Sequence, residues 1–172
     1  MPGEPAGAVR EDPFEALFRV EYGRVVAVAQ RVLDDSAEAE DVAQDVFWEF
    51  HRRHPQGLPQ AGGWLHAAAV HSSLNRLRGR RRRERRERMV DAPPAADPEG
   101  LHLQSEERRL VRQALAALPE RKAAVLALRY SGLSYAEVAG ALDVGTRQVG
   151  TLLRRAESAL LKQLEDIERG TP

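Results

Sequence analysis

The segment from Gly132 to Ala156, GLSYAEVAGALDVGTRQVGTLLRRA, constrains the fold of this chain more than any other. It predicts two short helices joined by a tight turn. Gly132 can close the preceding helix, because glycine tolerates the backbone angles of a helix end. Ser134 and Glu137 then have the spacing of a capping box, in which two residues satisfy each other's backbone at a helix start. The small apolar residues that follow would let a second helix cross closely.

The turn of this motif is predicted at Asp143–Gly145, and Thr146 is the predicted cap of the next helix. Apolar residues recur at helical spacing from Val149 to Ile167 and form an inward stripe. The polar residues outside this apolar stripe can face a groove of DNA. These residues are Arg147, Gln148, Thr151, Arg154 and Arg155. This is the outline of a DNA-binding helix-turn-helix, although an ordinary hairpin in a helical bundle shares it.

Helical patterns continue through the rest of the chain, whereas the alternation typical of strands does not persist anywhere. A first helix is predicted over residues 12–33. A second, over 35–53, opens with a capping box between its first residue and Glu38. Residues 54–63 are predicted to be a loop, because two prolines and three glycines disfavour a helix. A third helix is predicted to begin near Trp64 and to continue into an arginine run.

Residues 89–104 contain prolines and acidic residues and are predicted to form a flexible linker. After it, Pro119 occupies a favourable position for the start of a helix. The expected fold class is therefore all-α, with two small helical domains over residues 12–88 and 105–168. Residues 1–11 are predicted to be a disordered N-terminus.

Composition excludes several classes of function. The chain has no cysteine, which excludes disulfides, thiolate zinc sites and thiol catalysis. Its five histidines have no partners at metal-ligand spacing, and no phosphate-binding glycine loop is present. We therefore expect no enzyme activity, no metal and no cofactor. No apolar run approaches the ~20 residues of a membrane span, and the N-terminus does not resemble a signal peptide. A cytoplasmic protein without membrane insertion is expected.

Charge is segregated along the chain although the formal net charge is zero. Residues 1–50 carry 12 acidic and 4 basic side chains, whereas residues 51–90 carry 2 acidic and 11 basic ones. Such segregation indicates separate surfaces for separate partners. The arginine run over residues 80–88 can neutralise phosphates, and its charge exceeds what a solvated helix end needs. Contact with nucleic acid is therefore favoured there.

The second predicted helix carries an unusual polar face. Asp41, Asp45 and Trp48 share this face, with Gln44 beside them, away from the apolar stripe. An exposed tryptophan among carboxylates indicates a protein interface. In the alternative arrangement the tryptophan packs against the first helix and the acids are merely solvated. Periodicity does not decide between the two.

Three stretches, in this order, resemble extracytoplasmic-function (group IV) sigma factors of the sigma-70 family, over roughly residues 12–168. AEDVAQDVFWEF (39–50) is similar to region 2.2 of that family. GWLHAAAVHSSLNRLRGRRRR (63–83) resembles regions 2.3 and 2.4, and the sequence over 115–160 resembles region 4. The resemblance implies a bacterial RNA polymerase subunit that directs the enzyme to promoters.

The resemblance also implies three binding surfaces. Core polymerase, through its β′ clamp helices, would bind Asp41, Gln44, Asp45 and Trp48. The −10 promoter element would be bound by His71, Asn75, Arg76, Arg78, Arg80, Arg81 and Arg82. The −35 element would be bound by Ser134, Tyr135, Arg147, Gln148, Thr151, Arg154 and Arg155. Contacts with the polymerase β subunit and an anti-sigma factor are further implications of the family.

The reading helix departs from the family, because Gly150-Thr151-Leu152 replaces the usual Lys-Ser-Arg pattern. This removes cations and places a helix-weakening glycine in the reading surface. Two other functions therefore stay open at this point. One is a stand-alone helix-turn-helix regulator that binds duplex DNA without polymerase. The other is a degenerate sigma-like adaptor that holds another protein and no longer reads promoters.

Overall fold

The computed structural model describes residues 12–88 and 102–170, and within them the chain forms seven helices and no strand. This confirms the predicted all-α fold. The predicted disordered N-terminus and residues 89–101 of the predicted linker lie outside the described residues. None of the helices in the described part is long and apolar enough to cross a membrane.

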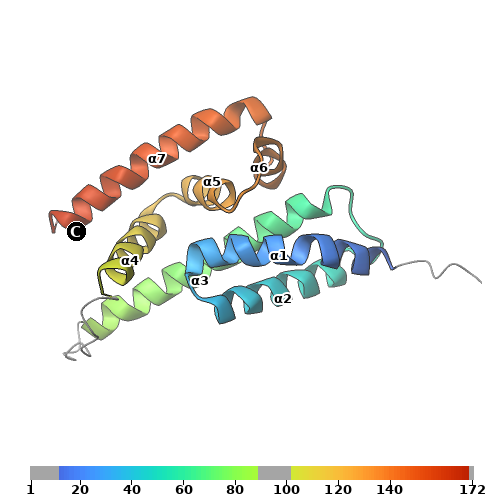
Figure 1. The fold of residues 1–172 in the computed structure, drawn as a ribbon, viewed down its shortest axis with the longest axis horizontal. Coiled ribbons are helices and arrows are strands. Elements are labelled where there is room, and N and C mark those ends of the chain that lie inside the picture. The colour runs from blue at the N-terminus through green and yellow to red at the C-terminus, as the bar shows by residue number, and fades with distance from the viewer. Residues whose placement is uncertain (1–11, 89–101, 171–172) are drawn as a thin grey trace, which may run out of the picture.

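The helices form two groups (Figure 1). The first group contains α1 (Pro13–Leu33), α2 (Ser36–Arg53) and α3 (Ala61–Arg88). The second contains α4 (His102–Ala117), α5 (Glu120–Tyr130), α6 (Tyr135–Leu142) and α7 (Thr146–Glu168). Helix α4 begins three residues before the predicted second domain. Helix α7 lies on the outside of the second group, and α5 lies between it and the first group (Figure 1).

Local caps fix the beginnings of α1 and α2. The Asp12 carboxylate accepts a hydrogen bond from the Phe14 amide at 3.0 Å, and Pro13 occupies the first helical position. Asp35 caps α2 in the same way, accepting from the Glu38 amide at 3.0 Å. Glu38 does not complete the predicted capping box, because its carboxylate pairs with Arg80 of α3 instead.

The start of α3 differs from the prediction. The loop ends at Gln60, so Gly62 and Gly63 lie in the first helical turn. A Cβ atom at Gly62 would lie 3.0 Å from Oε1 of Glu21, and one at Gly63 would lie 3.4 Å from backbone atoms of Gly140. The two glycines therefore let α1 and α6 approach α3 closely. Packing outweighs their low helix propensity.

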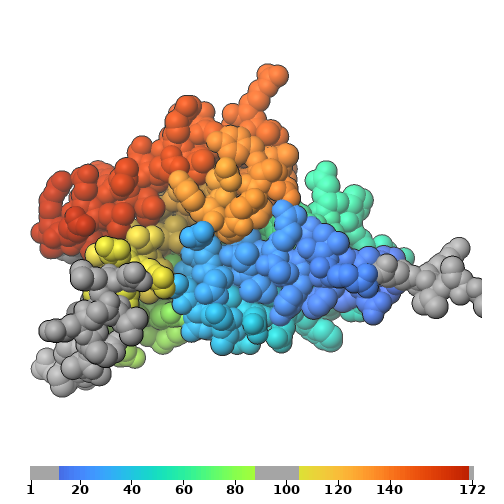
Figure 2. All heavy atoms as spheres, in the orientation of Figure 1, coloured from blue at the N-terminus to red at the C-terminus, as the bar shows by residue number. Residues whose placement is uncertain are grey.

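The two helical groups pack against each other in the described residues. One continuous cluster of buried apolar side chains includes members of both groups, such as Leu74 of α3 and Leu118 after α4. The Arg78 guanidinium donates to the Leu118 carbonyl at 3.1 Å and satisfies a group at the end of α4. Figure 2 shows α5 and α6, in orange, directly against the blue surface of α1. The sequence predicted two domains on a tether and did not predict this contact.

A polar cluster lies at this contact, with His66 and Glu21 buried and Arg24 and Glu137 partly exposed. His66 of α3 is 2 % exposed, and its Nε2 lies 2.9 Å from Oε2 of Glu21 on α1. Burial of the ring lowers the pKa of His66. Arg24 contacts Glu21 at 3.4 Å and also pairs with Glu137 of α6. The cluster therefore joins α1, α3 and α6.

Candidate nucleic-acid interface

Helices α6 and α7 form the predicted helix-turn-helix, and the predicted capping box is present at its start. The Glu137 amide donates to Oγ of Ser134 at 3.3 Å, and the Ser134 amide donates to Oε2 of Glu137 at 2.8 Å. The Arg24 guanidinium, together with these bonds to Ser134, lowers the pKa of Glu137 to about 2. The first helix of the motif is thus anchored both locally and to α1.

The turn of the motif is made differently from the prediction. Asp143 takes the left-handed conformation, with φ 51°, whereas Gly145 has an ordinary φ of −69°. Gly145, and not Thr146, is the N-cap of α7, and Thr146 is the first helical residue. The Gln148 side chain accepts a hydrogen bond from the Gly145 amide at 3.2 Å. The prediction missed this because it took a hydroxyl as the cap, whereas a glutamine at the third helical position stabilises the glycine.

Helix α7 presents the polar side chains that were assigned to the −35 surface. Val149, Leu153 and Ala156 are buried against the second group. The remaining face is exposed and carries Arg147, Gln148, Thr151, Arg154 and Arg155. Leu152 is half-buried and packs against the core. The helix therefore has the amphipathic form that a groove-binding helix needs.

Tyr135 packs beside Gly150 on this surface. A Cβ atom at Gly150 would lie 3.6 Å from the Tyr135 ring, which is an ordinary contact distance. The Arg129 guanidinium lies 5.6 Å from the centre of the same ring, within the range of a cation–π interaction. The Tyr135 ring thus lines the exposed surface of α7 next to Gly150, which has no side chain of its own.

Helix α2 exposes the residues that were assigned to polymerase. Asp41, Gln44 and Asp45 are exposed, and Trp48 is 69 % exposed. The aromatic residue that packs on α1 is Phe47, whose ring lies 4.9 Å from that of Phe18. The alternative in which Trp48 packs against the first helix is therefore wrong.

The side chains of α3 that were assigned to the −10 element do not form one open surface. His71 pairs with Glu120 of α5, and Arg78 lies 3.8 Å from the same carboxylate. Arg81 donates to the Gln113 carbonyl of α4 at 3.4 Å. All three residues thus make contacts with the second group, and Arg78 is the most covered of them, with its side chain 22 % exposed. Asn75 and Arg82 are exposed.

Two other arginines of α3 face α2. Arg76 donates to Oδ2 of Asp45 at 2.6 Å, and Arg80 pairs with Glu38. A groove of about 380 Å³ runs beside these pairs. It is lined by Glu38, Asn75, Arg76, Gly79, Arg80 and Arg83.

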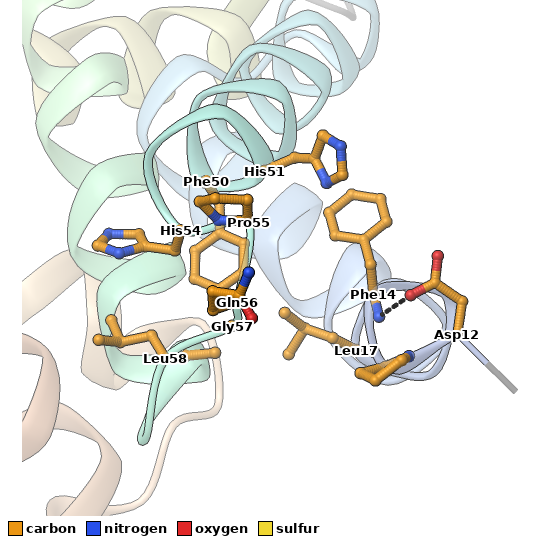
Figure 3. Close-up of a pocket in the computed structure, with 12 residues that line it drawn as sticks. Asp12, Phe14, Leu17, Phe50, His51, His54, Pro55, Gln56, Gly57 and Leu58 are labelled. Carbon is orange, nitrogen blue, oxygen red and sulfur yellow. Dashed lines mark hydrogen bonds between the residues drawn. The ribbon is translucent and has the colours of Figure 1, made fainter. Parts of the chain in front are cut away.

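A second cavity, of about 400 Å³, lies at the other end of this helical group (Figure 3). The start of α1, the end of α2 and the following loop form its wall. Figure 3 shows Phe14 and His51 side by side, with His54 across the cavity. The ring centres of Phe14 and His51 are 4.8 Å apart. Leu17, Gln56 and Leu58 are among the other lining residues. The wall offers apolar and aromatic surface with a few polar groups, which suits a flat ring.

His71 and Asn75, which sequence reasoning assigned to the −10 element, do not line this cavity. Sequence reasoning also missed Phe14 and His54 as site residues. Aromatic residues flanking a loop of prolines and glycines were the available signal. That signal was not sufficient, because the beginning of α1 comes near the loop only in the folded chain.

Comparison with known proteins identifies the family. The family model described as Sigma-70 region 2 matches residues 17–83, and the one described as Sigma-70, region 4, matches residues 108–160. Over 160 residues the chain is 31 % identical to the "ECF RNA polymerase sigma factor SigM" of Mycobacterium tuberculosis, covering 91 % of this chain and 80 % of that protein. It is 29 % identical to the "RNA polymerase sigma-H factor" of Pseudomonas aeruginosa, covering 91 % and 88 %.

A solved structure supports the same fold. The sigma factor RpoE of Bartonella quintana, in complex with the anti-sigma factor NepR, matches with a TM-score of 0.52 at 20 % identity, over 88 % of this chain and 96 % of that one. A chain with both regions, in this order, is a protein of the sigma-70 type. Its identity to SigM places it further: the chain belongs to the ECF RNA polymerase sigma factors. The resemblance inferred from sequence motifs is confirmed.

Proposed function

We propose that this sigma factor binds core polymerase through the exposed face of α2 and directs it to promoters with −10 and −35 elements. The observation that carries the proposal is the exposure of Trp48 between the carboxylates of α2. A large exposed aromatic side chain surrounded by polar groups is typical of a binding hot spot. The polymerase β′ clamp helices are the proposed partner of this face, with further contacts to the β subunit. The protein acts as a binding factor and not as an enzyme, in the cytoplasm where polymerase and promoters are found.

The cavity beside the start of α3 is the proposed site for an unpaired base of the −10 element. Phe14 and His51 supply ring faces, and stacking on such faces is worth about 1–3 kcal/mol per base. Unstacking a base costs a few kcal/mol, so capture alone would offset only part of opening the duplex. Polymerase and the arginines of α3 supply the rest.

The exposed face of α7 is the proposed −35 reader. Arg155 and Thr151 are placed to reach base edges in the major groove, whereas Arg147 and Arg154 lie closer to phosphates. Ser134 and Tyr135, at the start of α6, contribute contacts to the DNA backbone. Of these residues Tyr135 has the further role of lining the surface beside Gly150.

The contact between the two helical groups has a consequence for this function. His71, Arg78 and Arg81 make polar contacts with the second group, and separation of the groups would release all three for DNA. Polymerase and promoter would favour the separated state. An anti-sigma factor, of the kind bound to the related RpoE, would favour a closed one.

Run-off transcription with core polymerase tests the proposal. We expect a specific transcript from the wild-type chain and none from Asp45→Arg, because the charge reversal lies in the docking face. Glu40→Arg is the matched control: Glu40 is exposed on α2, and none of the ion pairs in the described residues involves it. This control should transcribe normally.

The two rival functions predict other results. A stand-alone regulator would bind promoter fragments tightly without core, and Asp45→Arg would leave that binding unchanged. A degenerate adaptor would give no product on any template. A pull-down from the native cell adds a second test, since polymerase or an anti-sigma factor should co-purify.

A further inference from the structure

Two carboxylates of α2 form ion pairs with arginines of α3. Asp45 bonds Arg76 at 2.6 Å, and Glu38 pairs with Arg80. We call these two pairs the α2–α3 ladder. Asp45 belongs to the proposed polymerase surface, whereas both arginines belong to the proposed −10 surface. One ion pair therefore joins residues that two different partners need.

The ladder sits where DNA would bind. The groove beside it is lined by Arg76, Arg80 and Arg83, and Glu38 is the only acidic residue in its wall. Gly79 forms part of the groove wall on the α3 side. When Glu38 and Asp45 hold these arginines, fewer donors remain for phosphate oxygens. The ladder thus masks part of a phosphate-binding groove.

We propose that the α2–α3 ladder couples docking on polymerase to capture of −10 DNA, through competition for the same charged groups. The proposal rests on the function proposed above. A polymerase cation that binds Asp45 releases Arg76 for a phosphate. A phosphate that binds Arg76 equally releases Asp45 for polymerase. The first partner to bind separates Asp45 from Arg76, and the second partner then binds without this cost. Each partner therefore strengthens the binding of the other.

The size of the coupling follows from exposure. The Asp45 side chain is 69 % exposed and that of Arg76 is 35 %, so water screens this pair. Exposed pairs of this kind correspond to a factor of about five or less in an equilibrium constant. Glu38 and Arg80 are less exposed, at 38 % and 31 %. The ladder is thus strong enough to bias binding and weak enough to open on contact.

The test measures two dissociation constants for the full chain. One is for a fluorescent single-stranded −10 oligonucleotide without core, and the other is for core polymerase without DNA. Asp45→Asn should tighten the oligonucleotide two- to fivefold more than the control Glu40→Gln, which removes the same charge outside the ladder. Arg76→Gln should tighten core binding by a similar factor over the control Arg82→Gln.

Glu38→Gln separates masking from docking, because Glu38 is outside the proposed polymerase surface. This variant should tighten the oligonucleotide beyond Glu40→Gln and leave core affinity unchanged. If the ladder variants and their controls change the dissociation constant equally, the proposal is overturned. This holds both for the oligonucleotide and for core polymerase. That outcome differs from failure of the proposed function, in which the wild-type chain binds no core and yields no transcript.

Discussion

The bond between Glu137 and Arg24 gives a prediction with a calculable size. Glu137 has two roles: its carboxylate completes the capping box with Ser134, and it pairs with Arg24 of α1. Replacement by glutamine separates these roles. Glutamine can still accept the bond from the Ser134 amide, but it carries no charge for the guanidinium. Replacement by alanine removes both interactions.

The magnitude follows from the pKa and the exposure. A fall in the pKa of Glu137 from 4.5 to about 2 corresponds to roughly 3 kcal/mol by linkage. The side chain is 36 % exposed, so solvent screening reduces the ion-pair share to about 1 kcal/mol. Glu137→Gln should therefore cost about 1 kcal/mol, which lowers Tm by about 2–4 °C in a chain of this size. Glu137→Ala should cost about 1 kcal/mol more, because the capping bond is lost too.

Urea unfolding at two pH values is the assay. A depressed carboxyl pKa contributes stability that is present above the unfolded pKa of about 4.3 and is lost as pH falls toward 2. The difference in unfolding free energy between wild type and Glu137→Gln should thus be full at pH 7 and roughly halved at pH 3. In a cycle with Arg24→Gln, the double variant should cost less than the sum of the two single changes. A difference that is undiminished at pH 3, together with additive costs, refutes this reasoning.

Three further results are expected. His66 is buried and its pKa is lowered, so the contribution of this residue to the free energy of unfolding should be complete above pH ~6.5 and fall below it by up to about 1 kcal/mol per pH unit. His66→Gln should flatten this slope in pH-dependent unfolding. An unchanged slope would mean that another group causes it. Gly150→Ala should raise Tm by about 2–4 °C, because alanine favours the helix and its Cβ makes an ordinary contact with Tyr135; a lower Tm would show strain at this contact. Trp48→Ala should change the unfolding free energy by no more than about 0.5 kcal/mol but weaken core binding about tenfold or more, whereas unchanged core affinity would remove Trp48 from the docking face.

Local signals in the sequence were sufficient for much of the fold. The caps at Asp35 and Ser134 involve residues three positions apart, and both were predicted and are present. Helical periodicity likewise gave the extents of α1 and α2. Such features depend on neighbours along the chain, so the sequence contains all the groups that form them. The motifs that identified the family are of the same local kind.

The sequence by itself therefore determined the all-α class, the helix-turn-helix and the membership of the sigma factors. Only the tertiary structure decided which charges meet. Asp45 lies 31 residues before Arg76, and Glu137 lies 113 residues after Arg24. Periodicity places each side chain on a face of its own helix, but the partner of that face depends on how the helices pack. For the same reason Gly62 and Gly63 became helical, and a cavity formed between the start of α1 and the loop after α2.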